Sequence, residues 1–176
     1  GVVVPMVTPV TPSGDIDDRA VERIVESLAR HEVSPLVMGT TGEGNSLSVE
    51  QGLALVKKVV EVAGRRITVY AALSGGSFRH HVAAAEAYRD SGADVIVATL
   101  PAYYALTAAQ MYQYYKTLAD RMTAPLMLYN IKATTHMSIP PEVIERLTGH
   151  PRIVGPKDSG RDLDRMKSCV GNSREN

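Results

Sequence analysis

The chain has 176 residues, of which 44% are hydrophobic and 22% charged, and this length is sufficient for one packed core. Lys plus Arg and Asp plus Glu balance at 19 each, which excludes bulk electrostatic attraction to nucleic acid, to an anionic membrane or to an acidic partner. The single cysteine, Cys169, excludes an intrachain disulfide and is typical of a reducing compartment, so we expect a cytoplasmic protein.

Neither a membrane-spanning segment nor a metal centre is indicated by the sequence. No apolar run approaches the length needed to cross a bilayer, and the apolar start, GVVVPMVTP, lacks the basic leader and cleavage site of a signal peptide. The five histidines and the lone cysteine form no cluster with ligand spacing. We therefore expect no membrane or nucleic-acid partner, no metal and no cofactor.

Six short apolar runs are predicted to be strands. They are rich in Val, Ile and Leu and do not alternate with polar residues, which is typical of strands buried on both faces. In chain order the runs are Val2–Val7, Pro35–Met38, Ile67–Leu73, Val95–Leu100, Pro125–Tyr129 and Ile153–Gly155.

Segments of helical period separate these runs. The first helix is predicted over about 17–31, and the sequences SVEQ and TAAQ have the spacing of a capping box at the start of two later helices. IPPEVIERL opens a helix with proline in its first turn. The last predicted helix begins near Asp162. Glycines placed to end helices in a left-handed conformation are Gly64, Gly92 and Gly149.

This strict alternation predicts a parallel α/β sheet covered by helices. Two architectures fit: a doubly wound open sheet and a (β/α)8 TIM barrel. Because a barrel needs eight units and typically about 250 residues, residues 1–176 would form a single but incomplete barrel domain, which lacks strands seven and eight. Both architectures place function at the carboxyl ends of the strands, where the polar and glycine-rich loops lie.

Three of these loops carry candidate functional groups. GTTGEG offers the hydroxyls of Thr40 and Thr41 and backbone N–H groups exposed by glycines, which can hold a carboxylate or phosphate; a tight strand–helix turn is the plain alternative. Tyr129 ends a strand, where a phenol can relay protons or simply belong to the core. Lys157 follows the last strand, as either an exposed edge lysine or an amine whose apolar surroundings favour the neutral, nucleophilic form.

Taken together, these motifs resemble the dihydrodipicolinate synthase and N-acetylneuraminate lyase family. The matching segments are GTTGE after the second strand, YN after the fifth, G-x-KD after the sixth, VTPVTPSGDID at the start and LPAYYALTAAQMYQYY in the middle. Members of that family are Schiff-base aldolases and lyases on a TIM barrel, so the resemblance implies that fold, of which this chain supplies about six β/α units.

The resemblance also implies a role for each candidate residue. Lys157 would form an imine with pyruvate or a related 2-oxo acid, and Tyr129 would shuttle protons. Tyr104 would reach the site of a neighbouring subunit in a homotetramer, a dimer of dimers. The carboxylate would be bound by Gly39, Thr40, Thr41 and Gly42. An aldehyde or a sugar acid would be the co-substrate, and no cofactor is implied.

The sequence departs from the family pattern at three positions. Lys132 stands where proline commonly follows YN-x, and Thr134 stands where dihydrodipicolinate synthases proper carry an arginine for the second substrate. Pro156 precedes the lysine in place of Ile, Leu or Val, either tilting Lys157 or lying where the ladder has stopped. A sugar-acid lyase, a dehydratase, another 2-oxo acid aldolase and a non-catalytic 2-oxo acid-binding relative therefore stay open.

A last alternative ignores the resemblance. In it, the chain is a doubly wound domain that binds a phosphorylated ligand at GTTGEG, and a reversal of strand order would identify it.

Overall fold

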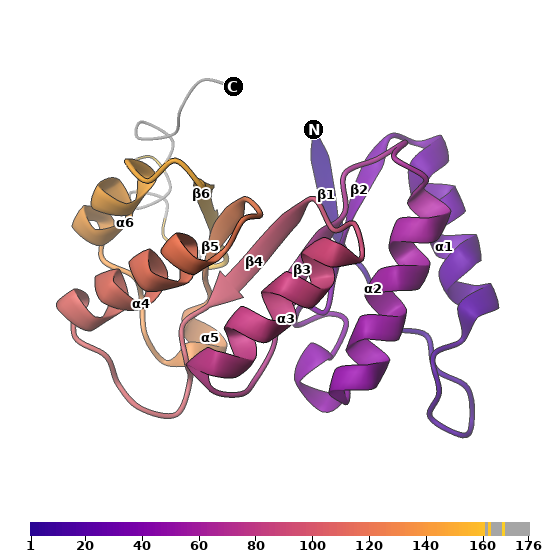
Figure 1. Ribbon diagram of the computed structural model, residues 1–176, viewed down its shortest axis with the longest axis horizontal. Helices are drawn as coiled ribbons and strands as arrows, with labels where there is room; N and C mark the ends of the chain where they lie inside the picture. The colour runs from indigo at the N-terminus through magenta and orange to yellow at the C-terminus, as the bar shows by residue number, and fades with distance from the viewer. Residues whose placement is uncertain (161, 163–166, 168–176) are drawn as a thin grey trace. The chain divides into compact units, whose positions relative to one another are not determined.

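The computed structural model describes residues 1–160, 162 and 167, and the chain divides into two compact units, Gly1–Ile96 and Val97–Asn176 (Figure 1). The helix predicted from near Asp162 and the side chain of Cys169 lie outside the described residues. In the part of the chain that is described, each helix is too short or too polar to cross a membrane.

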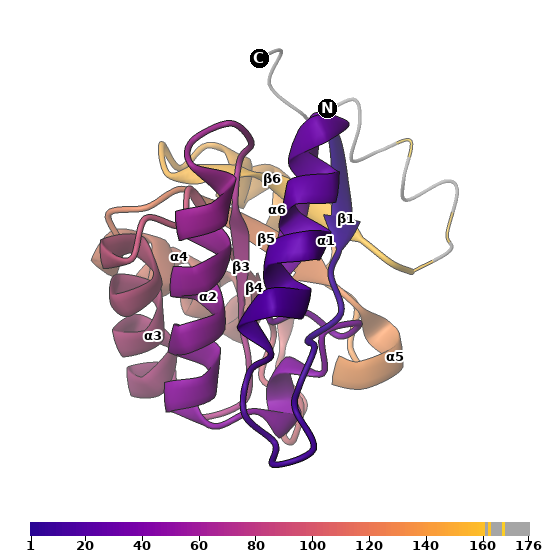
Figure 2. The same cartoon turned by 90° about the vertical axis from the view of Figure 1, so that its right-hand side faces the viewer.

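The first unit is built from parallel strands and three helices. Strand β1 pairs with β2, and β2 with β3, in parallel. Helices α1, α2 and α3 lie side by side (Figure 2). Its elements are β1 (Val2–Pro5), α1 (Asp18–Arg30), β2 (Val33–Val37), the 3-10 turn η1 (Gly44–Ser46), α2 (Val49–Ala63), β3 (Tyr70–Leu73), α3 (Phe78–Asp90) and the start of β4 (Val95–Thr99).

The second unit continues the alternation from the end of β4. Strands β5 and β6 pair in parallel, and helices α4 and α6 pack side by side. Its further elements are α4 (Ala108–Arg121), β5 (Leu126–Asn130), the short α5 (Lys132–Thr135), α6 (Pro141–Thr148) and β6 (Ile153–Asp158). In each unit the described strands follow one another in chain order. A doubly wound sheet would reverse this order at a switch point, so that alternative is wrong.

Local capping signals start the helices where the sequence predicts. Asp17 Oδ1 accepts from Ala20 N at 3.0 Å at the start of α1. Both predicted capping boxes are present, at Ser48 before α2 and at Thr107 before α4. Pro141 opens α6, where its missing N–H leaves no intrahelical bond unmade.

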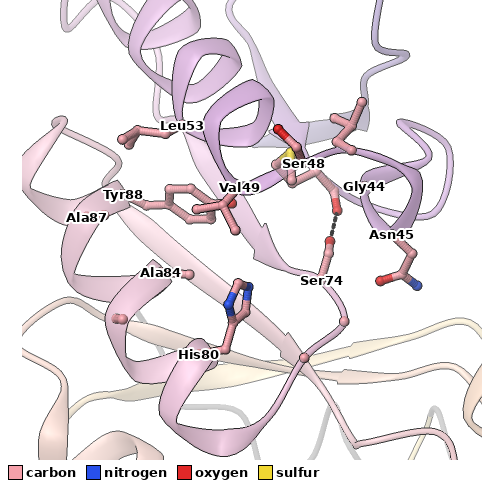
Figure 3. A pocket seen from close by; sticks show the side chains of 15 residues that line it. Gly44, Asn45, Ser48, Val49, Leu53, Ser74, His80, Ala84, Ala87 and Tyr88 are labelled. Carbon is pink, nitrogen blue, oxygen red and sulfur yellow. Dashed lines mark hydrogen bonds between the residues drawn. The ribbon is translucent and has the colours of Figure 1, made fainter.

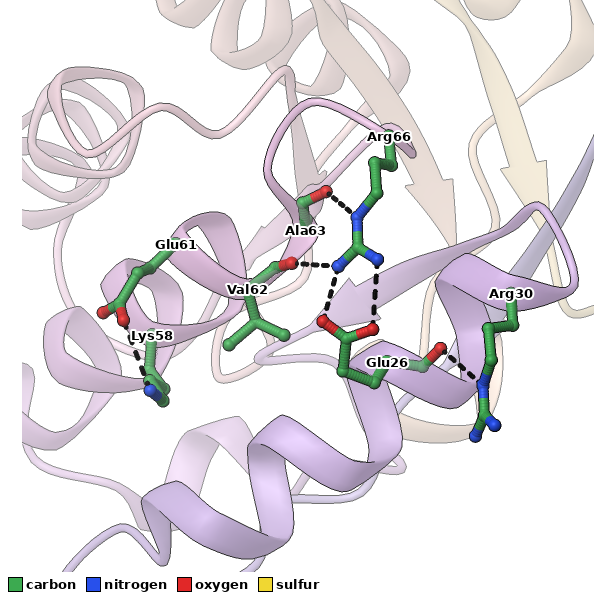
Figure 4. A network of polar contacts seen from close by, with 7 residues as sticks. All are labelled: Glu26, Arg30, Lys58, Glu61, Val62, Ala63 and Arg66. Atoms are coloured by element: carbon green, nitrogen blue, oxygen red, sulfur yellow. Dashed lines mark hydrogen bonds and ion pairs between the residues drawn. The ribbon is translucent and has the colours of Figure 1, made fainter.

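Apolar side chains of the helices and strands form the core of each unit. In the first unit these include Val21, Val25, Leu36, Leu55, Val56 and Val59; in the second they include Tyr115, Leu118, Leu126, Leu128, Ile144 and Leu147. At the rim of the first unit, Arg66 donates to both carboxylate oxygens of Glu26, at 2.7 and 3.0 Å, and so ties α1 to the end of α2 (Figure 4). This bidentate contact lowers the pKa of the Glu26 carboxyl.

Several predictions about the elements need correction. Strand β3 begins at Tyr70 instead of Ile67, and β2 spans Val33–Val37 instead of Pro35–Met38. Strand β1 is exposed along its length instead of buried, because it is the first strand in the sheet order and composition does not distinguish an end strand from a central one. Gly149 ends α6 with φ −66°, so it does not adopt the left-handed conformation, unlike Gly64 at φ 55°. Strand β6 extends to Asp158, three residues beyond the predicted end at Gly155.

Candidate active site

The ends of β5 and β6 bring two of the predicted residues together. In the register of this parallel pair, Tyr129 lies opposite Lys157, and Asn130 lies opposite Asp158. These are the last two residues of each strand, so the pair stands at the carboxyl edge, where α/β proteins place their sites.

A β-bulge determines which residue of β6 faces Tyr129. Leu126 pairs with Ile153 but Met127 pairs with Gly155, so Val154 has no partner of its own in β5. Without the extra residue, Pro156 would lie opposite Tyr129, because a shift of one residue moves every pair along the strand. Gly155 adopts φ 143° at the bulge, a conformation that glycine accepts and other residues avoid.

Pro156 lies within the paired part of β6. The ladder continues through this proline, which pairs with Leu128, so the suggestion that pairing has already stopped there is wrong. Strand β6 is the last strand in the described order, and nothing in the structure explains why proline stands at this position.

The amine of Lys157 contacts the ring of Tyr129 and a hydroxyl. Nζ lies 3.5 Å from the centroid of the Tyr129 ring and donates to Ser159 Oγ at 3.2 Å. Tyr129 is 6% exposed, and Lys157 is half-buried. An ammonium over an aromatic face is attracted by the ring, by about 0.5–2 kcal/mol. The phenol ring thus forms a wall beside the amine; sequence reasoning anticipated this neighbour but not Ser159.

The GTTGEG loop is a tight turn in the first unit, and backbone contacts determine its shape. Gly44 N donates to Gly39 O at 3.2 Å, and Thr8 Oγ1 donates to Gly42 O at 2.6 Å. A Cβ on Gly44 would lie 2.2 Å from the carbonyl oxygen of Met38, so no larger residue fits there. Gly39 and Gly42 are buried.

The side chains of Thr40 and Thr41 are exposed on this turn. Their hydroxyls are therefore accessible to a ligand, as the predicted carboxylate role requires. They belong to the first unit, whereas Tyr104, Tyr129 and Lys157 belong to the second.

The tyrosines of the second unit divide into surface and packing residues. Tyr104 is 75% exposed in the loop after β4, and its ring meets that of Tyr103 edge to face, with 4.8 Å between centroids. In α4, the hydroxyls of Tyr114 and Tyr115 donate to carbonyls of β4, each at 3.2 Å. Burial raises the pKa of both phenols, and their hydrogen bonds to β4 make them packing residues.

Two of the three residues that depart from the family pattern, Lys132 and Thr134, lie in α5. Lys132 begins this short helix and is exposed. Thr134 Oγ1 donates to Ile131 O at 3.3 Å, so this hydroxyl is already engaged with the backbone.

A cavity of about 430 Å³ lies in the first unit between α2 and α3 (Figure 3). Its polar groups come from Asn45, Ser48, Ser74, His80 and Tyr88, and the remaining lining is apolar or glycine. His80 and His81 are adjacent in α3, and adjacent residues of a helix point in different directions. This holds in the structure: His80 lines the cavity, whereas His81 is buried and its Nε2 donates to Gly75 O.

No metal centre is found in the described part of the chain, where no three His, Cys, Asp or Glu side chains are grouped to hold an ion.

Comparison with known proteins places the chain in a family. Residues 1–176 match the dihydrodipicolinate synthetase family. The 4-hydroxy-tetrahydrodipicolinate synthase of Pseudomonas aeruginosa is 33% identical over 171 residues, which cover 97% of this chain and 59% of that relative. The crystal structure of dihydrodipicolinate synthase from Bacillus anthracis superimposes with a TM-score of 0.94 at 28% identity, covering 99% of this chain and 61% of that one.

A second solved structure is similar to the same extent. The chloride-inhibited dihydrodipicolinate synthase from Acinetobacter baumannii, complexed with pyruvate, superimposes with a TM-score of 0.93 at 33% identity, covering 97% of this chain and 59% of that one. The chain spans about three fifths of the length of these proteins, and its fold is that of their TIM barrel over about six β/α units. The predicted fold is thus confirmed, and the chain belongs to the dihydrodipicolinate synthetase family.

Proposed function

We propose that this chain carries the imine-forming site of a lyase or aldolase that acts on pyruvate or a related 2-oxo acid. The observation that carries the proposal is the position of Lys157 Nζ, 3.5 Å from the centroid of the Tyr129 ring at the carboxyl ends of two neighbouring strands. Family membership and the pyruvate bound to the Acinetobacter baumannii relative support the choice of substrate.

In this proposal Lys157 is the nucleophile. The lone pair of its neutral amine attacks the keto carbon, and a proton moves from nitrogen to the former carbonyl oxygen to give a carbinolamine. The hydroxyl of the carbinolamine then takes a proton from the Tyr129 phenol and leaves as water, so that a protonated imine remains. The imine withdraws electrons from the adjacent carbon, which loses a proton to give an enamine. The enamine then adds to an aldehyde, or forms when the bond to a sugar acid is broken.

The other predicted residues serve this chemistry. Tyr129 moves protons to and from the carbinolamine and the reacting carbon. Thr40 and Thr41, on the turn from Gly39 to Gly42, hold the substrate carboxylate and so orient the keto carbon. Tyr104 reaches a neighbouring subunit of a homo-oligomer, a dimer of dimers, and its 75% exposure leaves it accessible for that contact.

Borohydride trapping tests the proposal directly. Reduction in the presence of pyruvate should attach the three-carbon acid to Lys157, as peptide mass spectrometry would show. Lys157→Met should abolish the adduct, and Lys132→Met, a change at an exposed lysine, should retain it. A folded sample in which Lys157 stays unmodified would contradict the proposal. Pyruvate-dependent thermal stabilisation without an adduct would indicate the non-catalytic, 2-oxo acid-binding alternative instead.

A further inference from the structure

Asn130 connects the end of β5 to the segment that follows Lys157. Its Nδ2 donates to Asp158 Oδ2 at 3.0 Å, and its backbone carbonyl accepts from Ser159 N at 2.9 Å. Its Oδ1 accepts from Ile139 N at 2.9 Å. Because Asn130 is only 2% exposed, water does not readily replace these partners, and the loss of one leaves a buried polar group unpaired.

The segment that Asn130 holds carries the hydroxyl that meets the amine. Asp158 Oδ1 accepts a hydrogen bond from Gly160 N at 2.6 Å, and this bond closes a tight turn around Ser159. Lys157 Nζ donates to Ser159 Oγ at 3.2 Å. We therefore expect that a change in the contact between Asn130 and Asp158 shifts the Ser159 hydroxyl away from the amine, although the backbone hydrogen bond from Ser159 N to Asn130 O is retained.

We propose that Asn130 is a positioning residue, which acts through Asp158 and Ser159 to hold the Lys157 amine at the ring face of Tyr129 in the orientation for attack on a keto carbon. The inference rests on the proposed function, because the orientation of the amine matters for catalysis only if Lys157 forms the imine. Its physical basis is that a reacting group displaced by about 1 Å loses on the order of 100-fold in rate.

An exchange of donor and acceptor between Asn130 and Asp158 tests the inference. In Asn130→Asp, the contact with Ile139 N is retained, but two carboxylates meet where Nδ2 donated to Asp158. The double variant Asn130→Asp/Asp158→Asn restores one donor and one acceptor and keeps the net charge. We expect the single variant to lower the rate constant of adduct formation by about tenfold or more, and the double variant to restore it to within about threefold.

A second pair of variants tests the route through Ser159. Ser159→Ala should slow adduct formation as Asn130→Asp does, Ser159→Thr should restore it, and Asn130→Asp should add no further loss in the Ser159→Ala background. The core variant Ile144→Val in α6 controls for lowered stability, since it leaves these hydrogen bonds intact. An unchanged rate in Asn130→Asp, or a folded double variant that stays as slow as the single one, would overturn the inference.

Labelling of the amine separates this inference from the proposed function. An amine-acylating reagent needs no pyruvate, and the exposed Lys132 provides an internal reference for its reactivity. Asn130→Asp should change the ratio of Lys157 to Lys132 labelling, and the double variant should restore the wild-type ratio. If the wild-type protein forms no pyruvate adduct, the proposed function fails, and this ratio still decides whether Asn130 positions the amine.

Discussion

Lys157 and Tyr129 are cross-strand partners, and the amine of the first lies over the ring of the second, with 3.5 Å between Nζ and the ring centroid. This contact uses the aromatic face, so it does not depend on the phenol hydroxyl. Packing beside the amine and proton transfer to the substrate can therefore be separated by mutation.

Tyr129→Phe should retain the final extent of adduct at Lys157 but slow both adduct formation and turnover. The phenylalanine ring preserves the wall beside the amine, whereas the hydroxyl that moves protons is lost, at a cost of about 10²–10⁴-fold in kcat. Borohydride trapping and steady-state kinetics on the same sample measure the two effects. Turnover equal to that of the wild type would remove Tyr129 from the proton relay.

Thr40→Val and Thr41→Val should weaken substrate binding without unfolding the first unit. Both side chains are exposed, and valine has nearly the same shape as threonine. A hydrogen bond to a charged group contributes about 1.5–3 kcal/mol, so each variant should raise the pyruvate concentration for half-maximal trapping roughly 10- to 150-fold. If this concentration does not change in either variant, the carboxylate is held elsewhere.

Gly155→Ala and Gly149→Ala should have opposite effects on stability. Neither change creates a clash, because a Cβ meets nothing within 4 Å at Gly155 and an ordinary contact of 3.5 Å at Gly149. The backbone conformation therefore determines the sign of each effect. Gly155 has φ 143°, which a residue with a side chain avoids, so Gly155→Ala should lower the free energy of unfolding by about 1–3 kcal/mol. Gly149 has a helical φ of −66°, which alanine adopts without strain, so Gly149→Ala should raise the free energy of unfolding by about 0.4–1 kcal/mol.

Urea unfolding of the two glycine variants measures both changes in the free energy of unfolding. Gly155→Ala should also slow adduct formation, because the bulge places Lys157 opposite Tyr129. A stability loss at Gly149 of the same size as that at Gly155 would contradict the conformational explanation.

The stability of the protein should fall as the pH decreases from about 7 to 5.5, in part because of His81. Burial is the largest cause and lowers the pKa of this imidazole. The hydrogen bond to Gly75 O raises the pKa, the charge of His80 lowers it, and the net shift is downward. The folded state therefore binds the proton less readily than the unfolded state, whose histidine titrates near 6.5. The stabilisation is present above about pH 6.5 and is lost as the pH falls towards the folded pKa.

His81→Gln provides the matched variant for this pH dependence, since an amide can still donate to Gly75 O but does not titrate. Urea midpoints measured at pH 7 and pH 5.5 should differ less in His81→Gln than in the wild type. An equal difference in the two proteins would assign the pH dependence to other groups.

Sequence alone predicted the order and type of most elements and singled out the residues of the candidate site. The capping boxes at Ser48 and Thr107, the proline at the start of α6 and the apolar periods are local signals, which depend on residues within one or two turns. Lys157, Tyr129 and the Thr40–Thr41 turn could be singled out because each polar group ends or follows a predicted strand.

Tertiary structure alone decided how Lys157 and Tyr129 meet. The bulge at Val154 and Gly155 places Lys157, instead of Pro156, opposite Tyr129, and no local pattern in IVGPKD predicts it. The contact of Asn130 with Asp158 and of the amine with Ser159 follows from the same pairing. Strand register is set between segments that are distant in sequence, so a shift of one residue, invisible in composition and period, changes every side chain that faces the site.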